Sequence, residues 1–171
     1  MKTHSFMLIA LILPLALRAQ AEPAGTPKQL AERYAKALLA GDTNLAASCL
    51  LPLAAYAKAA GINPEKMNEA DLAAHHAKYL KKRLKDVKGF PTEAPQLGLQ
   101  PDAVSKVSVV VNPPKENHVD PQVVLWFEAG VDRWKCEIQG CFEHEGGWYL
   151  YDIHWLGKDN GPQNKGVQAT K

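Results

Sequence analysis

"CEIQGCFEHEGGWYLYDIHW", residues 136–155, decides the fold of this chain, because it is either a cluster of metal ligands or the last hairpin of a sheet. It contains two cysteines, two histidines and four acidic side chains. Gly146-Gly147 separates two segments in which apolar and polar residues alternate, a pattern that predicts a two-residue hairpin turn. In that register His144 faces Tyr149, and directly opposed residues share one face of the sheet.

A second turn, at residues 129–132, sets the register of the preceding strand and pairs Leu125 with Cys136. Successive residues of a strand point to opposite faces, so the two turns separate apolar from charged side chains. The inner face is predicted to contain Val123, Leu125, Phe127, Trp134, Cys136, Ile138, Phe142, His144, Tyr149, Tyr151, Ile153 and Trp155. The outer face is predicted to contain Glu128, Arg133, Lys135, Glu137, Gln139, Cys141, Glu143, Glu145, Trp148, Asp152 and His154.

This separation argues against a metal centre. Cys136 and His144 fall on the inner face, whereas Cys141 and His154 fall on the outer face, so the four side chains cannot surround one ion. A β-bulge at Gly140 would turn part of the strand over, but it would also send polar side chains into the core. We therefore expect no metal site and no cofactor.

Upstream of the strands, the apolar residues recur with helical spacing. Thr26 is predicted to cap a first helix that buries Leu30, Tyr34 and Leu38 and ends at Gly41. Asp42 or Thr43 is expected to cap a second helix, which stops at Pro52.

The next segments are expected to be an alanine-rich turn or helix up to residue 61 and a long helical region over residues 63–88 that breaks near residue 68. Residues 89–101 are rich in proline and glycine and are predicted to be a loop. The strands are expected at residues 107–111, 122–128, 133–145 and 148–156.

Helices followed by antiparallel strands indicate an α+β domain, with the N-terminal helices packed in the concave face of a curled sheet. We expect this domain to span residues 27–156, after a linker at residues 22–26 and before a disordered tail at residues 157–171.

The first residues are typical of an export signal. Lys2 precedes an apolar run at residues 6–17, and Ala19-Gln20-Ala21 is a small-residue cleavage site. The run is too short to cross a bilayer, which takes roughly 20 apolar residues. We therefore expect a signal peptide at residues 1–21, a periplasmic or extracellular location, and no stable membrane anchor.

Charge limits the partners that this chain can have. It has 20 basic and 18 acidic residues, and loss of the signal removes Lys2 and Arg18 but no acid, which leaves the charges balanced. A nucleic-acid partner needs a net basic surface, so we expect none. The basic run between Lys78 and Lys88 is a local exception, with a solvated helix face as one interpretation and an anionic partner or membrane surface as the other. The helix has no matching face of Trp or Phe, which argues against a membrane surface.

Two further clusters leave alternatives open. Cys49 is expected to face Cys136, so a disulfide between them and two buried free thiols are both compatible with the pattern. His75 and His76 occupy adjacent helical positions, which point about 100° apart. They cannot chelate one ion, and we expect one to be buried and the other exposed.

"ERYAKALLAGDTNLAASCLLP", residues 32–52, resembles the first two helices of the nuclear transport factor 2-like superfamily, whose fold is the cystatin-like cone. Gly146-Gly147-Trp148 is similar to the start of the closing strand in that family. The resemblance implies helices packed inside a curled antiparallel sheet. The family includes isomerases, cyclases and dehydratases, and also many non-catalytic binding or assembly modules.

The resemblance also gives Tyr34 a role to test. In the ketosteroid isomerase branch a tyrosine on the first helix donates a hydrogen bond to the oxyanion, and a carboxylate base follows the second helix. Residues 51–61 contain no aspartate or glutamate, and the predicted inner face contains no carboxylate. Proton transfer by that mechanism therefore lacks its base and its second donor.

We therefore predict an exported, non-enzymatic domain that binds a small apolar or aromatic ligand or a protein partner. The alternative is a small isomerase- or cyclase-type enzyme with Tyr34 and His144 as its candidate catalytic residues. Trp148 on the outer face suggests a homodimer through that face of the sheet. The predicted ligand-binding residues are Tyr34, Tyr79, Phe127, Trp134, His144, Tyr149 and Tyr151.

Overall fold

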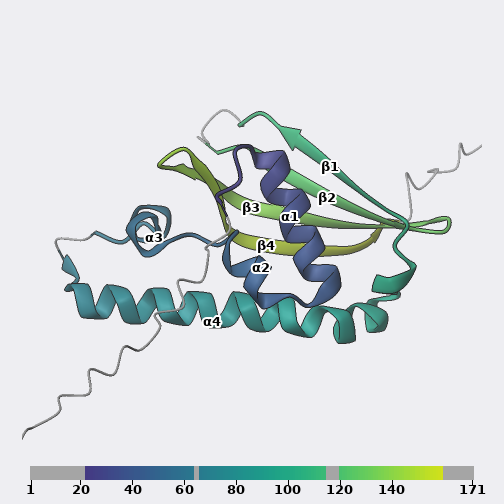
Figure 1. Cartoon of the computed structure of the whole chain (residues 1–171), viewed down its shortest axis with the longest axis horizontal. Helices are drawn as coiled ribbons and strands as arrows, with labels where there is room; N and C mark the ends of the chain where they lie inside the picture. The colour runs from purple at the N-terminus through teal and green to yellow at the C-terminus, as the bar shows by residue number, and fades with distance from the viewer. Residues whose placement is uncertain (1–21, 64–65, 115–119, 160–171) are drawn as a thin grey trace, which may run out of the picture.

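The computed structural model describes residues 22–63, 66–114 and 120–159, so the predicted signal peptide and residues 160–171 of the predicted tail lie outside it. The described chain is an α+β domain with helices packed on an open, four-stranded antiparallel sheet of order β1-β2-β3-β4 (Figure 1). The helix α1 crosses one face of the sheet, and α4 runs beside the β4 edge (Figure 1). The α+β prediction is thereby confirmed.

The first helices form as their capping residues predict. The helix α1 (Pro27–Ala40) begins at Thr26, whose Oγ1 accepts a hydrogen bond from the Gln29 amide, and ends at Gly41 in the left-handed conformation. The Asp42 side chain caps α2 (Thr43–Ala47) by accepting two backbone hydrogen bonds. The short α3 (Leu53–Ala59) follows Pro52.

The long helix extends further than its sequence predicts. It is α4 (Glu69–Glu93), which Asn68 caps and which continues through Gly89 and Pro91 into the predicted loop. The short 3₁₀ helices η2 (Ala94–Leu97) and η3 (Pro101–Ala103) then lead to the sheet. Tertiary packing outweighs the tendency of Pro91 to end a helix, because Val87 before it and Ala94 and Leu99 after it are fully buried.

The strands are β1 (Lys106–Asn112), β2 (Gln122–Ala129), β3 (Asp132–His144) and β4 (Gly147–Asp159). The register between β2 and β3 is the predicted one, with Leu125 opposite Cys136 and Phe127 opposite Trp134. β4 continues to Asp159, so the first three residues of the predicted disordered tail belong to the sheet.

The predicted turn between β3 and β4 was wrong by one residue. The two turn residues are Glu145 and Gly146, both with positive φ, as a type I′ turn requires. His144 therefore pairs with Gly147, and Phe142 takes the place opposite Tyr149. Gly147 has a different role, because a Cβ atom there would collide with Pro23 of the N-terminal segment.

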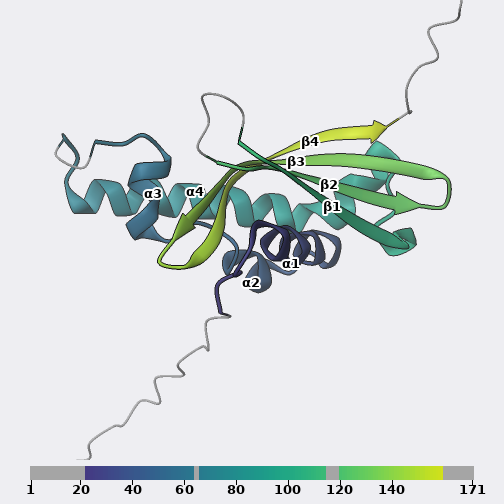
Figure 2. The same cartoon turned by 90° about the horizontal axis from the view of Figure 1, so that it is seen from above.

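The β3–β4 hairpin bends sharply along its length (Figure 2). We assign the bend to Gly140, because its φ of +71° departs from the extended conformation and the buried positions of β3 change there from even to odd residue numbers. Beyond the bend, the Leu150 amide donates to the Cys49 carbonyl and the Trp148 amide donates to the Ala24 carbonyl. The hairpin tip thus hydrogen-bonds to the N-terminal segment and to the end of α2. The residues 22–26, predicted as a linker, are attached to the sheet through Ala24, which is buried.

The bend also reverses which side chains are buried at the tip. Cys141, predicted to be on the outer face, is fully buried together with its partner Leu150. His144 and Tyr149, predicted to be on the inner face, are only half-buried. Before the bend the predicted inner face holds, as Phe127 and Ile138 illustrate. Glu137 and Gln139 stay out of the core, because only the residues beyond Gly140 change face. The register between β3 and β4 is the same on both sides of Gly140.

We predict that Gly140→Ala destabilises the fold by at least about 2 kcal/mol. The added Cβ would strain a backbone with φ +71° and would lie 2.7 Å from the Phe142 ring. Gly146→Ala is the matched control: its φ is +78° but nothing lies within 4 Å, so only strain of about 1 kcal/mol is expected. Urea unfolding of both variants measures the difference. Equal losses would mean that the hairpin can shift to accept the side chain.

Candidate functional site

The seven predicted ligand-binding residues do not line one cavity. Tyr34 and Phe127 are fully buried, Trp134 is 2% exposed and Tyr79 is 9% exposed, all within the core formed by the helices and the sheet. The remaining three, at the hairpin, are half-buried. Around Tyr34, Phe127 and Trp134, the space between the helices and the sheet is therefore filled by the protein's own side chains.

The two candidate catalytic residues are not hydrogen-bonded to each other. The Tyr34 hydroxyl is buried and has no hydrogen-bond partner in the described part of the chain. Burial raises the pKa of Tyr34 well above its ordinary value, and the neighbouring Cys136 thiol raises it further. His144 lies at the hairpin tip, where its Nε2 is 3.9 Å from a Glu145 carboxylate oxygen.

We predict that Tyr34→Phe leaves the free energy of unfolding unchanged or raises it by roughly 1 kcal/mol. A buried hydroxyl without a partner has lost its hydration and gains nothing in return, so its removal relieves a cost. Chemical denaturation measures the change. A clear loss of stability would show that the hydroxyl makes a hydrogen bond in the folded protein.

An aromatic cluster gathers where α3, α4 and the hairpin meet. The Tyr79 and Tyr151 rings stack with centroids 5.6 Å apart, and Tyr56 contacts both. His76 stacks on Tyr79 at 5.8 Å, and Phe142 meets Tyr151 edge-on at 6.4 Å. Of the predicted ligand-binding residues, the structure brings only Tyr79 and Tyr151 into this cluster.

Hydrogen bonds give the cluster a structural role. The Tyr79 hydroxyl donates to the Leu150 carbonyl at 2.8 Å and accepts from the Leu51 amide at 3.2 Å. The His76 Nε2 lies 2.8 Å from the Leu51 carbonyl oxygen, and His75 is exposed, as predicted for one of the pair. The cluster therefore ties α4 to the hairpin tip and to the segment after α2.

An ion pair between a buried arginine and a partly exposed aspartate attaches α4 to the β4 edge. Arg83, 8% exposed, places Nη1 2.6 Å from an Asp152 carboxylate oxygen and 3.5 Å from that of Asp86. Asp152 and His154 were predicted to share the outer face; Asp152 binds a residue of α4, and His154 is exposed. The pairing compensates Arg83 for the loss of water, because a buried charge needs a partner.

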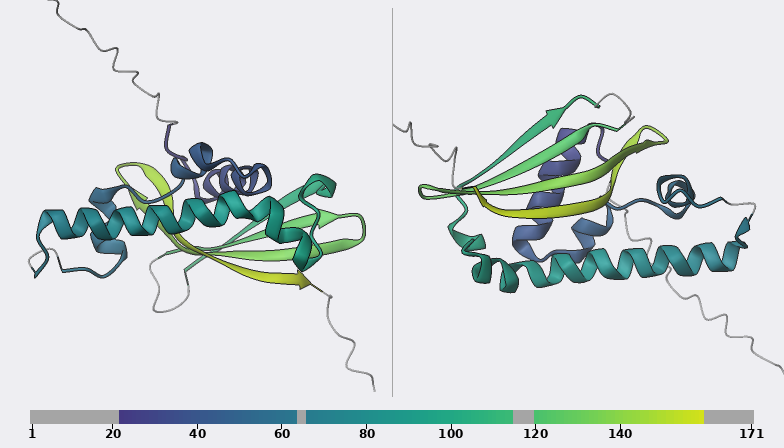
Figure 3. Two further views of the ribbon diagram at one scale, coloured as in Figure 1. Left: turned by 90° about the horizontal axis from the view of Figure 1, so that it is seen from below. Right: turned by 180° about the vertical axis from the view of Figure 1, so that it is seen from behind.

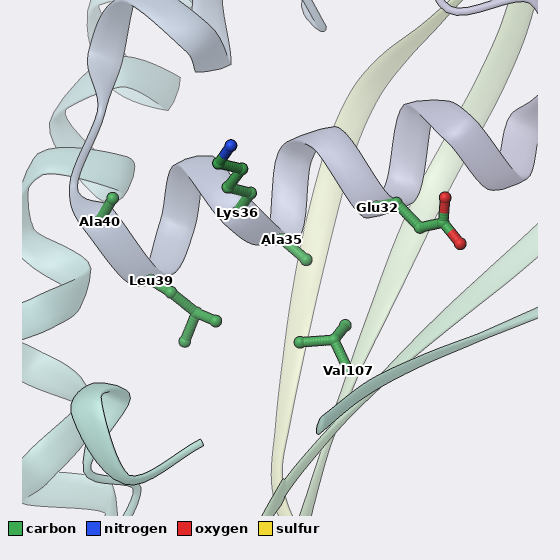
Figure 4. A pocket seen from close by; sticks show the side chains of 6 residues that line it. All are labelled: Glu32, Ala35, Lys36, Leu39, Ala40 and Val107. Atoms are coloured by element: carbon green, nitrogen blue, oxygen red, sulfur yellow. The ribbon is translucent and has the colours of Figure 1, made fainter. Parts of the chain in front are cut away.

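Two grooves lie away from these residues. The first, of about 400 Å³, separates α1 from β1, and its floor is apolar (Figure 4). Leu39 and Ala35 point into it from α1, and Val107 points into it from β1 (Figure 4). Glu32 and Lys36 place opposite charges along the α1 side. The second, of about 350 Å³, contains Glu137 and Gln139 of β3 beside Asp120 and Pro121.

The sequence reasoning missed the first groove. Leu39 is one residue beyond the predicted buried stripe of α1, and Val107 was predicted only as the start of a strand. Both are only half-buried, because α1 crosses the sheet and leaves the end of β1 uncovered. The signal that could have found Leu39 is the doublet Leu38-Leu39, because the second leucine widens the apolar stripe of α1 by about 100° beyond the predicted one. No local signal pointed to Val107.

Trp148 does not support the predicted outer-face contact. Its side chain packs partly buried against the core, and its amide is bonded to Ala24. The aromatic side chain on the outer face is Trp126, which lies under the Arg133 guanidinium at 4.4 Å from the ring centroid. This cation–π contact partly covers the ring.

Cys49, Cys136 and Cys141 are buried free thiols. Burial raises the pKa of Cys49 to about 11 and the pKa of Cys136 and Cys141 to about 12. Within the described ranges 22–63, 66–114 and 120–159, no group of three or more His, Cys, Asp or Glu side chains could hold a metal ion.

We predict that the thiols stay unreactive at pH 8 in the native protein and that all three react after denaturation without reductant. The thiol pKa is 9.0 in the unfolded chain and is higher in the folded protein, which therefore holds the thiol protons more tightly. The contribution of the protonated thiols to the free energy of unfolding is therefore complete below pH 9. It falls as the pH rises from 9 towards 11 and 12. Thiol titration and urea melts across this window test both points, and a count of one thiol would show a disulfide instead.

Comparison of the chain with protein-family models, with curated proteins and with solved structures found no match in any of the three. Among the described helices, none is both long enough and apolar enough to cross a membrane.

Proposed function

We propose that this chain is an exported, non-enzymatic binding domain whose partner is a protein that adds an extended segment to the free edge of β1. The observation that carries this proposal is the apolar groove between α1 and β1 at an uncovered sheet edge. Residues 1–21 support export through their sequence pattern. The order of helices and strands supports the likeness to a nuclear transport factor 2-like cone.

The β1 edge has the features that favour strand addition. β1 pairs with β2 on one side, and the described residues place no strand on its other side. An unpaired edge offers backbone donors and acceptors to an incoming strand. Val110 and Val111 are 44% and 40% exposed there, although β-edges are commonly protected by charges.

The groove supplies a place for the side chains of such a segment. Alternate residues of an added strand would point towards the α1 side, where Leu39 and Val107 form an apolar floor. Glu32 and Lys36 stand beside it and favour a partner with both charges over a purely acidic or basic one.

The other versions of the function have less support. A small-ligand pocket inside the fold would need open space beside Tyr34, Phe127 and Trp134. The protein's own side chains cover these three residues, whose exposed fractions are at most 2%. The enzyme version would need Tyr34 and His144 at one site, but the Tyr34 hydroxyl is buried and has no partner among the described residues, and His144 lies at the hairpin tip.

We predict that linear peptides selected from a displayed library bind along β1. Bound peptide should slow hydrogen exchange of the β1 amides, because they become paired. Val107→Lys should weaken binding by roughly tenfold or more, since it places a charge in the apolar groove. Val131→Lys, in a fully exposed turn position, is the control and should bind normally.

The proposal fails if selected peptides protect the aromatic cluster around Tyr79 and Tyr151 rather than β1, or if Val107→Lys binds them as tightly as the wild type. Thermal melts of both lysine variants establish that any loss of binding occurs in a folded protein.

A further inference from the structure

A row of lysines covers the solvent face of α4. Lys78, Lys81, Lys82, Lys85 and Lys88, here called the lysine stripe, are all exposed. At 100° per residue, their positions fall within an arc of about 120°, and the row is about 15 Å long. The opposite side of the helix carries Tyr79, Arg83 and Val87, which are buried. Packing against the fold therefore fixes the direction of the stripe.

In the described part of the chain, no ion pair neutralises the lysines of the stripe. Among the described residues, the ion pairs with Asp and Glu involve other cations, and the nearest acid along the helix, Asp86, is engaged by Arg83. Because the chain outside the signal has balanced charge, the stripe is a local concentration of positive charge and not part of a general excess. Like charges this close repel one another, so an anionic surface facing them is favoured.

We propose that the lysine stripe binds the surface of an anionic lipid bilayer, so that the domain attaches to a membrane peripherally. The α4 ribbon lies at the outside of the molecule, nearest the viewer when the fold is seen from below (Figure 3, left). A flat surface can therefore meet all five ammonium groups of this helix together. Clusters of four to eight basic residues on one helix are typical of reversible binding to anionic lipids, at about 1 kcal/mol for each residue.

The chemistry of the stripe favours lipid head groups over other anions. Lysine is a hydrated point charge on a flexible stem, suited to a diffuse layer of phosphates rather than to the two-pronged recognition that arginine gives. The residues of α4 that lie within its arc beyond the lysines include Asp71, Ala74, Gly89 and Thr92, which offer neither an aromatic platform for nucleic-acid bases nor a large apolar anchor for a protein partner. Attachment is therefore electrostatic and without insertion.

This attachment is independent of the strand-addition proposal. The β1 edge and α4 lie on opposite sides of the fold (Figure 1). A domain held by the stripe would present β1 away from the bilayer. Loss of either property should leave the other unchanged, because no residue is shared between the two surfaces.

The test is co-sedimentation of the full domain with vesicles of phosphatidylcholine alone and of equimolar phosphatidylcholine and phosphatidylglycerol. Binding is expected only to the anionic vesicles and should disappear at high salt. Each lysine near such a surface strengthens binding roughly fivefold, so the triple variant Lys81→Gln, Lys82→Gln, Lys85→Gln should bind about 100-fold more weakly.

The control is Lys28→Gln, Lys58→Gln, Lys158→Gln, which removes the same charge from other elements and should bind like the wild type. An equal loss of vesicle binding in both triple variants would show that binding depends only on the net charge of the protein, and it would overturn the proposal. So would failure of the wild type to bind anionic vesicles, including the outcome in which polyglutamate or duplex DNA binds through the stripe but vesicles do not. Circular dichroism confirms folding, which substitutions at exposed positions should preserve.

Discussion

The bend at Gly140 is the constraint on which the rest of the structure depends. A straight hairpin would carry the tip of β3 and β4 away from the helices. The bent hairpin instead brings Leu150 into contact with Cys49, and Trp148 with Ala24, by backbone hydrogen bonds. This joins the N-terminal segment, the end of α2 and the sheet into one core, which also includes Cys141.

The same closure determines where a partner can bind. With the tip folded back, Tyr79 ties α4 to the hairpin, and Tyr34 is sealed beneath the sheet. The polar groups that looked functional are thereby used for structure: Tyr79 bridges two backbone groups and Arg83 holds Asp152. Surfaces open to partners are at the periphery, namely the β1 edge with its groove and the lysine stripe of α4.

The sequence predicted the helices, the strands and the register of β2 with β3, because each depends on local signals. Thr26 and Asp42 are capping residues, and the valines of β1 alternate. The predicted register was wrong at the β3–β4 turn, where two glycines are adjacent in the sequence. Gly146-Gly147 contains one glycine needed for positive φ and one needed for contact with Pro23, a residue more than a hundred positions away. No local pattern distinguishes the two.

The predicted pocket failed for a related reason. Strand alternation tells which residues share a face, and it placed Phe127 and Trp134 correctly on the inner one. It does not tell whether the opposing helices fill the space above them. Nor does it tell where α1 leaves a strand uncovered, which is what creates the groove at Leu39 and Val107.

The sequence by itself therefore determined the class of fold, the boundaries of most elements and which side chains of β2 and of β3 before the bend face the helices, since these follow from backbone conformation and periodicity. Tertiary structure alone decided the burial of Cys141, the pairing of Arg83 with Asp152, and the difference between a filled interior and an open one. These features arise where segments distant in the chain compete for the same volume, and only the folded arrangement specifies which segment occupies it.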